Sequence, residues 1–121
     1  MTKKPAGFKL WPRFRVECGE GIALGPGKVD LLEMIRETGS IAEAAKQLQM
    51  SYMRAWTLVK TMEDCFREPL IKVTRGGANR GGAQLTQTGE EVIVLYRRLE
   101  EQSSAATADT WRELQTLLRQ V

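Results

Sequence analysis

Histidine is absent from this 121-residue sequence, so the side chain that most often acts as a general base or a metal ligand is missing. Only two cysteines are present, Cys18 and Cys65, which are too few for a disulfide scaffold and, without histidine, for a zinc site. We therefore predict that both cysteines are reduced, as is usual in a cytosolic protein. We expect no metal, no cofactor and no enzymatic activity.

A long hydrophobic run is also missing. No stretch of about 18 apolar residues occurs, so we expect no membrane-spanning helix. No apolar segment follows the basic start at residues 1–5, so we expect no signal peptide. Hydrophobic residues still make up 42% of the chain, which is enough for the core of one domain. The sequence thus predicts a flexible tail at residues 1–7 and a folded, cytoplasmic protein without a membrane partner.

The net charge of +3 is unevenly distributed along the chain. Residues 1–89 contain 14 basic and nine acidic side chains, whereas residues 90–121 contain four basic and six acidic ones. A basic front half favours contact with a polyanion such as nucleic acid. A solvated surface with a chance asymmetry would give the same pattern.

The first part of the chain predicts a hairpin followed by a helix. Apolar and charged residues alternate at 14–18, which is typical of a strand, and residues 22–24 are expected to return as its partner after a glycine turn. Apolar residues at helical spacing predict a helix at residues 28–38 that ends at Gly39.

Two further helices with a short turn between them are predicted at about residues 40–65. A Ser-x-x-Glu capping box at residues 40–43 starts a helix at 41–48, and its apolar residues fall on one face. Ser51 can cap a third helix that reaches about residue 66. The outward face of this third helix has no acidic residue before its last turn and is rich in donors suited to base edges and phosphates. Its outward residues are Ser51, Tyr52, Arg54, Thr57, Lys60 and Thr61.

The chain after Pro69 predicts a second hairpin and a helical end. Strands at 70–75 and 83–86 flank a glycine-rich loop whose glycines allow close approach to another backbone. A Thr-x-x-Glu box at residues 88–91 predicts the start of a helical segment, which is either one long helix or two. Its apolar stripe exceeds what a domain core needs and favours a homodimer. The expected dimer contacts are Leu95, Leu99, Trp111, Leu114 and Leu118.

The order of these elements predicts a winged helix-turn-helix, a mainly α fold with a small amount of β. We expect the winged domain at residues 8–87 and a C-terminal helical dimerisation segment at residues 88–121. In this fold the second helix of the pair enters the major groove of double-stranded DNA. The hairpin, or wing, reaches the adjacent backbone or minor groove. We expect the wing to contact DNA through Lys72, Arg75, Asn79 and Arg80.

The sequence also resembles a known family. Residues 39–48 and the Ser-Tyr-x-x-Ala-Trp motif at 51–56 are similar to the N-terminal winged helix of ModE-type molybdate-responsive regulators, which itself resembles the LysR-type DNA-binding domain. The resemblance covers roughly residues 12–100. It implies a two-fold dimer in which the terminal helices pair, a recognition helix that opens with Ser51, Tyr52 and Arg54, and a wing that includes Arg75, Asn79 and Arg80.

One departure from that family concerns molybdate. ModE-type regulators carry molybdate in a separate C-terminal domain, which these 121 residues do not contain, so we expect no molybdate binding. We predict a sequence-specific, homodimeric DNA-binding transcriptional regulator. Two alternatives stay open: a protein-interaction module on a winged-helix scaffold, and a regulator that binds an oxyanion through its wing and basic N-terminus.

Overall fold

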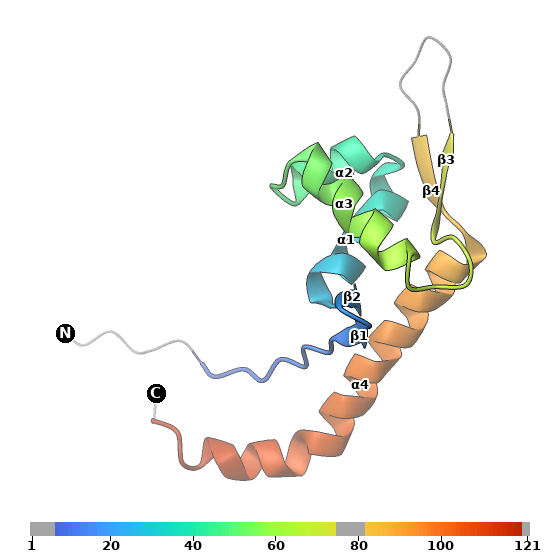
Figure 1. Cartoon of the computed structure of the whole chain (residues 1–121). Helices are drawn as coiled ribbons and strands as arrows, with labels where there is room; N and C mark the ends of the chain where they lie inside the picture. Colours follow the sequence, from blue (N-terminus) through green and yellow to red (C-terminus); the bar gives the residue numbers. More distant parts are fainter. Residues whose placement is uncertain (1–6, 75–81, 120–121) are drawn as a thin grey trace, which may run out of the picture.

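The computed structural model describes residues 7–74 and 82–119 (Figure 1). A helical body carries a hairpin on each side, and a long last helix extends away from it. The elements in chain order are β1 (Val16–Cys18), β2 (Gly21–Leu24), α1 (Pro26–Thr38), α2 (Ile41–Gln47), α3 (Tyr52–Glu63), β3 (Ile71–Thr74), β4 (Gly82–Leu85) and α4 (Gln87–Gln115). The mainly α fold with a small amount of β is confirmed.

The caps of the first three helices are local features of the sequence. Pro26 lies at the first position of α1, and Gly39 ends that helix with φ 73°, a left-handed conformation that glycine adopts without penalty. The Ser40 hydroxyl accepts a hydrogen bond from the Glu43 amide at 3.1 Å. The Ser51 hydroxyl accepts one from the Arg54 amide at 3.0 Å. Both predicted serine caps are therefore confirmed.

The turn between α2 and α3 is closed by two backbone hydrogen bonds. The Met50 amide donates to the Ala45 carbonyl at 2.9 Å, and the Gln49 amide donates to the Lys46 carbonyl at 3.1 Å. This pattern is a Schellman motif. It requires Gln49 to adopt φ 59°, which few residues other than glycine do. The short turn fixes the angle at which α3 leaves α2.

Two antiparallel hairpins flank the helices. In the first, β1 pairs with β2 with a register shift between Val16 and Glu17. In the second, β3 pairs with β4 from Ile71 opposite Leu85 to Thr74 opposite Gly82. The Ala83 amide donates to the Gly39 carbonyl at 2.9 Å, so the second hairpin is attached to the turn between α1 and α2.

The last helix is capped two residues earlier than the sequence indicates. The predicted cap at Thr88 is wrong, because the Thr86 hydroxyl accepts from the Gly89 amide at 3.0 Å and also donates to the Pro69 carbonyl at 2.6 Å. The structure also answers whether this segment is one helix or two, since α4 is continuous. It curves (Figure 1). The Thr107 hydroxyl donates to the Ser103 carbonyl at 2.7 Å, a type of bond that bends helices.

The core joins all three helices of the body to the first turns of α4. Leu31, Leu32 and Ile35 of α1 are fully buried, and Tyr96 of α4 is 1% exposed. The other buried core residues are Leu24, Val29, Ile41, Ala44, Ala45, Ala55, Val59, Met62, Leu70, Ile71, Ala83, Val92 and Ile93. Arg97 of α4 holds the outer edge of this packing, since its guanidinium bonds both oxygens of Glu33 on α1.

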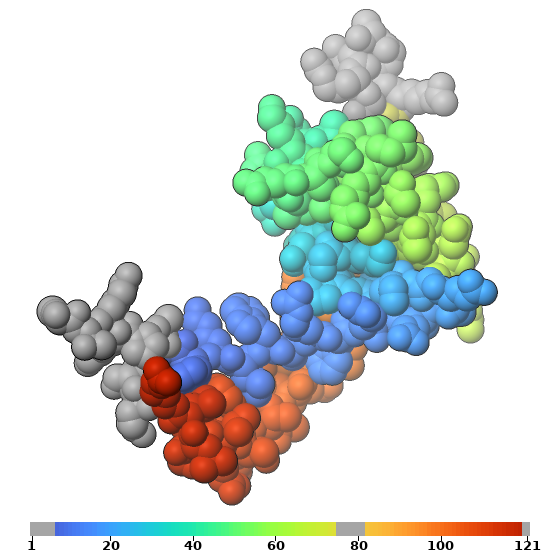
Figure 2. Space-filling view, turned by 60° about the vertical axis from the view of Figure 1, so that its left-hand side comes forward, coloured from blue at the N-terminus to red at the C-terminus, as the bar shows by residue number. Residues whose placement is uncertain are grey.

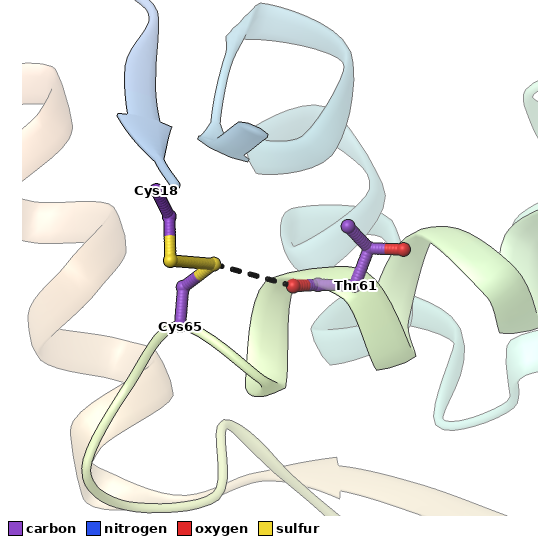
Figure 3. The surroundings of a disulfide bond; sticks show 3 residues. All are labelled: Cys18, Thr61 and Cys65. Atoms are coloured by element: carbon purple, nitrogen blue, oxygen red, sulfur yellow. Dashed lines mark hydrogen bonds between the residues drawn. A yellow bond between two sulfur atoms is a disulfide. The ribbon is translucent and has the colours of Figure 1, made fainter. Parts of the chain in front are cut away.

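The prediction that both cysteines are reduced is wrong for this structure. Cys18 and Cys65 form a disulfide, with their Cα atoms 6.1 Å apart (Figure 3). The bond joins the end of β1 to the turn that follows α3. The two cysteines are separated by 47 positions, and only the packing of the hairpin against α3 brings them together.

Candidate nucleic-acid interface

The first turns of α3 present a large polar surface to solvent. Tyr52 and Met53 are 54% and 67% exposed, and Arg54, Thr57 and Lys60 are exposed as well. The opposite side of the helix is formed by buried Ala55, Val59 and Met62. Helical periodicity therefore predicts this face correctly for Ser51, Tyr52, Arg54, Thr57 and Lys60. Thr61 differs, because it is half-buried and its hydroxyl donates to the Thr57 carbonyl at 2.8 Å.

Lys28 is a basic residue of this surface that the sequence analysis missed. It lies in the first turn of α1, is half-buried, and is near enough to Arg54 of α3 for the two positive charges to interact. Burial lowers the pKa of the Lys28 ammonium, and the positive charge of Arg54 lowers it further. Among the described residues, no carboxylate lies within ion-pair distance of either cation. Two neighbouring cations without an acid form a surface suited to a polyanion.

Two further features of α3 shape the same surface. The Lys60 ammonium lies 5.6 Å from the centroid of the Trp56 ring, a cation–π contact that restrains the lysine in the last turn of the helix. Met53 was also missed, because methionine in a helix usually indicates core. Its exposed thioether side chain can contact the methyl groups that mark thymine in the major groove.

The wing stands beside this face. Lys72 and Val73 of β3 are exposed, Val73 by 52%. Arg75, Asn79 and Arg80, which the sequence analysis assigns to the wing tip, lie outside the described residues. An open groove of about 720 Å³ separates the two elements and is lined by Tyr52 of α3, by Val73 and Ala83 of the wing, and by the start of α2.

A carboxylate at the end of α3 fixes the base of the wing. The Glu63 Oε2 atom accepts hydrogen bonds from the backbone amides of Leu70 at 2.9 Å and Ile71 at 3.0 Å. An acidic residue in the last turn of a helix is unfavourable for the helix itself, so this position has a tertiary role. The sequence shows the charge but not its partners.

The outer half of α4 and the chain before β1 form an arm that projects from the body (Figure 2). Leu10, Trp11 and Pro12 lie against Ser104 and Thr107 of α4. The arm exposes large apolar side chains that a monomer leaves in water. Among the expected dimer contacts, Leu95, Leu99 and Leu114 are 52%, 44% and 48% exposed, whereas Trp111 and Leu118 are half-buried.

Residues 7–74 and 82–119 contain neither a metal-binding cluster nor a membrane-spanning helix. No cluster of three or more acidic or cysteine side chains is placed to hold a metal ion there. Within the same ranges, no helix has the length and apolarity to cross a membrane.

These elements define a winged helix-turn-helix in which α3, the second helix of the α2–α3 pair, is exposed. This is the architecture of a DNA-binding module. A family model described as "Bacterial regulatory helix-turn-helix protein, lysR family" matches residues 27–90. The match runs from the start of α1 to the first turn of α4 and covers more than half of the chain. The chain therefore belongs to the LysR-type family of DNA-binding transcriptional regulators.

Curated relatives refine this assignment. The chain is 38% identical over 94 residues to the molybdenum transport protein ModE of Azotobacter vinelandii, which covers 78% of the chain and 35% of the relative. It is 35% identical over 85 residues to the transcriptional regulator ModE of Haemophilus influenzae, covering 70% of the chain and 33% of the relative. The similarity to ModE-type regulators is thus confirmed, and the chain spans about a third of the length of these proteins.

A solved structure shares the fold. Full-length CbnR complexed with its target DNA superimposes with a TM-score of 0.53 at 21% sequence identity, covering 69% of this chain and 27% of that one. At this identity the likeness supports the winged fold itself.

Proposed function

We propose that this chain binds double-stranded DNA as a homodimer and reads sequence through the N-terminal turns of α3. The observation that carries the proposal is the exposed start of α3, which has no acidic residue in its first turn and whose Arg54 adds its charge to that of Lys28 of α1. An exposed helix of this kind fits the major groove, and a wing beside it reaches the neighbouring backbone. Because chromosomal DNA is its target, we infer that the protein works in the cytoplasm.

The two cations have different roles in this proposal. Arg54 follows the exposed Tyr52 and Met53 in the first turn of α3, where side chains reach base edges, so we assign it to base recognition. Lys28 lies on α1, outside the recognition helix, so we assign it to a backbone phosphate. Ser51, Tyr52, Thr57 and Lys60 complete the proposed surface of the helix, and Lys72, Arg75, Asn79 and Arg80 complete the wing.

A salt titration separates these roles. Fluorescence anisotropy would follow binding to a duplex selected from random sequence by the wild-type protein. We expect Lys28→Ala to weaken all duplexes alike and to reduce the slope of log K against log salt by about 0.9. We expect Arg54→Ala to cost about 1–3 kcal/mol and to relax preference at one base pair. Wild-type binding without any salt dependence, or no binding at all, would contradict the proposal.

We assign the dimer interface to the apolar face of α4, from Leu95 and Leu99 in its first half to Leu114 in the projecting arm, because these side chains are exposed in the isolated chain. A two-fold dimer places two half-sites about 34 Å apart on DNA. Light scattering would test the interface with Leu99→Asp, which should give a monomer. Val94→Asp is a matched control, because Val94 is 53% exposed and lies about 140° around the helix from Leu99. An unchanged dimer in Leu99→Asp would contradict the assignment of this face of α4 to the interface.

A further inference from the structure

The disulfide between Cys18 and Cys65 lies at a junction between three functional parts of the molecule. Cys65 follows directly after α3, and Cys18 ends β1. The segment that leads into the hairpin of Cys18 is in turn attached to α4, because the Tyr96 hydroxyl donates to the carbonyl of Phe14, two residues before β1, at 2.7 Å. The covalent bond therefore connects the proposed recognition helix, through the hairpin, to the helix that carries the proposed dimer contacts.

The sulfur atoms lie outside the hydrophobic core. Both cysteines are half-buried, and their neighbours Gly19, Glu20 and Asp64 are exposed. None of the residues that form the core is a cysteine. A reductant can therefore approach the bond, and the core can persist when the bond is open.

The reduced state has a hydrogen-bond acceptor already in place. The Cys65 Sγ atom lies 3.6 Å from the Thr61 carbonyl oxygen (Figure 3). A disulfide sulfur carries no proton, so this contact becomes a hydrogen bond only when Cys65 is a thiol. The local structure thus accommodates both redox states, because the Cys65 thiol has a hydrogen-bond acceptor when the disulfide is open.

We propose that Cys18 and Cys65 form a reversible thiol/disulfide switch that sets the affinity for DNA. The proposal rests on the proposed function, because a DNA-binding protein works in a reducing compartment, where disulfides are usually transient and redox-sensing. In the oxidised state the end of α3 is tied to the hairpin and so to α4. In the reduced state this connection loosens, the two recognition helices of a dimer hold their spacing less well, and DNA is bound more weakly.

The chemistry balances with two named classes of co-reactant. A dithiol reductant attacks one sulfur, the Cys18–Cys65 bond breaks, and the displaced cysteine thiolate takes up a proton. The second thiol of the reductant then releases the other cysteine and leaves as a cyclic disulfide. In the opposite direction, the two cysteine thiols give two electrons and two protons to hydrogen peroxide, which yields the disulfide and two molecules of water.

The test compares one protein in two redox states. The full chain would be oxidised with peroxide or reduced with dithiothreitol, and its thiols would be counted by maleimide labelling. Binding to the selected duplex would then be measured by anisotropy. We expect the reduced form to bind about tenfold more weakly, within the range usual for coupled sites, and reoxidation to restore the affinity. Hydrogen exchange should become faster at residues 62–66 and stay unchanged in the buried part of α4.

Two controls make the result decisive. The double variant Cys18→Ser and Cys65→Ser should bind like the reduced protein in both buffers. Circular dichroism should show the same helix content in the oxidised and reduced wild type. Equal affinity of the two forms, a bond that resists the reductant, or unfolding on reduction would each overturn the switch. If the oxidised protein binds no duplex, the proposed function fails together with the switch. If the oxidised and reduced forms bind the duplex equally well, only the switch is contradicted.

Discussion

Replacing Glu63 by alanine should destabilise the protein strongly, although the residue lies in no binding site and ends an α-helix. Its carboxylate accepts two hydrogen bonds from the backbone, at 2.9 Å from Leu70 and 3.0 Å from Ile71. Hydrogen bonds to a charged acceptor contribute about 1.5–3 kcal/mol each. Leu70 is fully buried, but Glu63 is half-buried and water can replace part of the loss. The two bonds would together contribute about 3–6 kcal/mol if no water replaced them. Because water replaces part of this, we expect Glu63→Ala to lower the free energy of unfolding by about 2–4 kcal/mol.

The glutamine variant separates the charge from the hydrogen bonds. Both amides donate to the same oxygen of Glu63, so the single amide oxygen of Glu63→Gln can replace it. Neutral hydrogen bonds have roughly half the strength of charge-assisted ones. Glu63→Gln should therefore cost about half as much as Glu63→Ala. Glu101→Ala, an exposed position on α4, is the matched control and should stay within about 0.5 kcal/mol of the wild type.

The assay is urea unfolding of the oxidised protein, followed by far-ultraviolet circular dichroism. A loss of this size is a large share of the roughly 5–15 kcal/mol that stabilise an average domain. The variant should also bind DNA more weakly, since the wing loses its fixed base. This account of the wing would be refuted if Glu63→Ala were as stable as the Glu101→Ala control. It would also be refuted if Glu63→Gln lost as much free energy of unfolding as Glu63→Ala.

Two other predictions concern the packing of α4. Burial raises the pKa of the Tyr96 hydroxyl above its ordinary value of 10.0, so its stabilising contribution is complete below about pH 10 and is lost as the pH rises through the folded-state pKa. Tyr96→Phe, which removes the bond to Phe14, should cost about 1 kcal/mol at neutral pH and flatten the alkaline loss of unfolding free energy; an unchanged alkaline slope would contradict this assignment. A Cβ at Gly89 would overlap the Leu70 carbonyl oxygen, so Gly89→Ala should lower the stability in thermal melts by about 1–3 kcal/mol despite the better helix propensity of alanine. Gly27→Ala, where a Cβ meets nothing within 4 Å, should be neutral or stabilising, and equal melting points for the two variants would contradict the close approach at Gly89.

The features that the sequence predicts well are those decided within a few residues. The Ser40 and Ser51 caps depend on an amide three positions away, and the exposed face of α3 depends only on helical periodicity. The start of α4 is different. Thr86 and Thr88 are both able to cap, and Thr86 is selected because its hydroxyl also reaches the Pro69 carbonyl, 17 positions away. A tertiary contact therefore decides between two equivalent local signals.

The contacts that the sequence does not show are all long-range. Cys18 and Cys65 look like two isolated thiols until the hairpin packs against α3. Lys28 belongs to the first helix by sequence, and only the fold brings its charge near that of Arg54 on α3. The expected roles of Arg75, Asn79 and Arg80 stay predictions, because these residues lie outside the described part of the chain.

The two ends of α3 have separate tasks in this arrangement. Its first turn exposes Tyr52, Met53 and Arg54 to a ligand, while its last turn and the turn after it hold Glu63 and Cys65. Glu63 fixes the wing and Cys65 fixes the hairpin, so both attachments meet at the C-terminal end of the helix, beyond the residues assigned to the proposed DNA contact. In the proposed dimer, changes at this end should therefore alter the positions of the wing and of the second subunit relative to the first turn. They should change the affinity for a two-half-site duplex more than the affinity for a single half-site, whereas Arg54→Ala should weaken both in proportion to the number of half-sites bound.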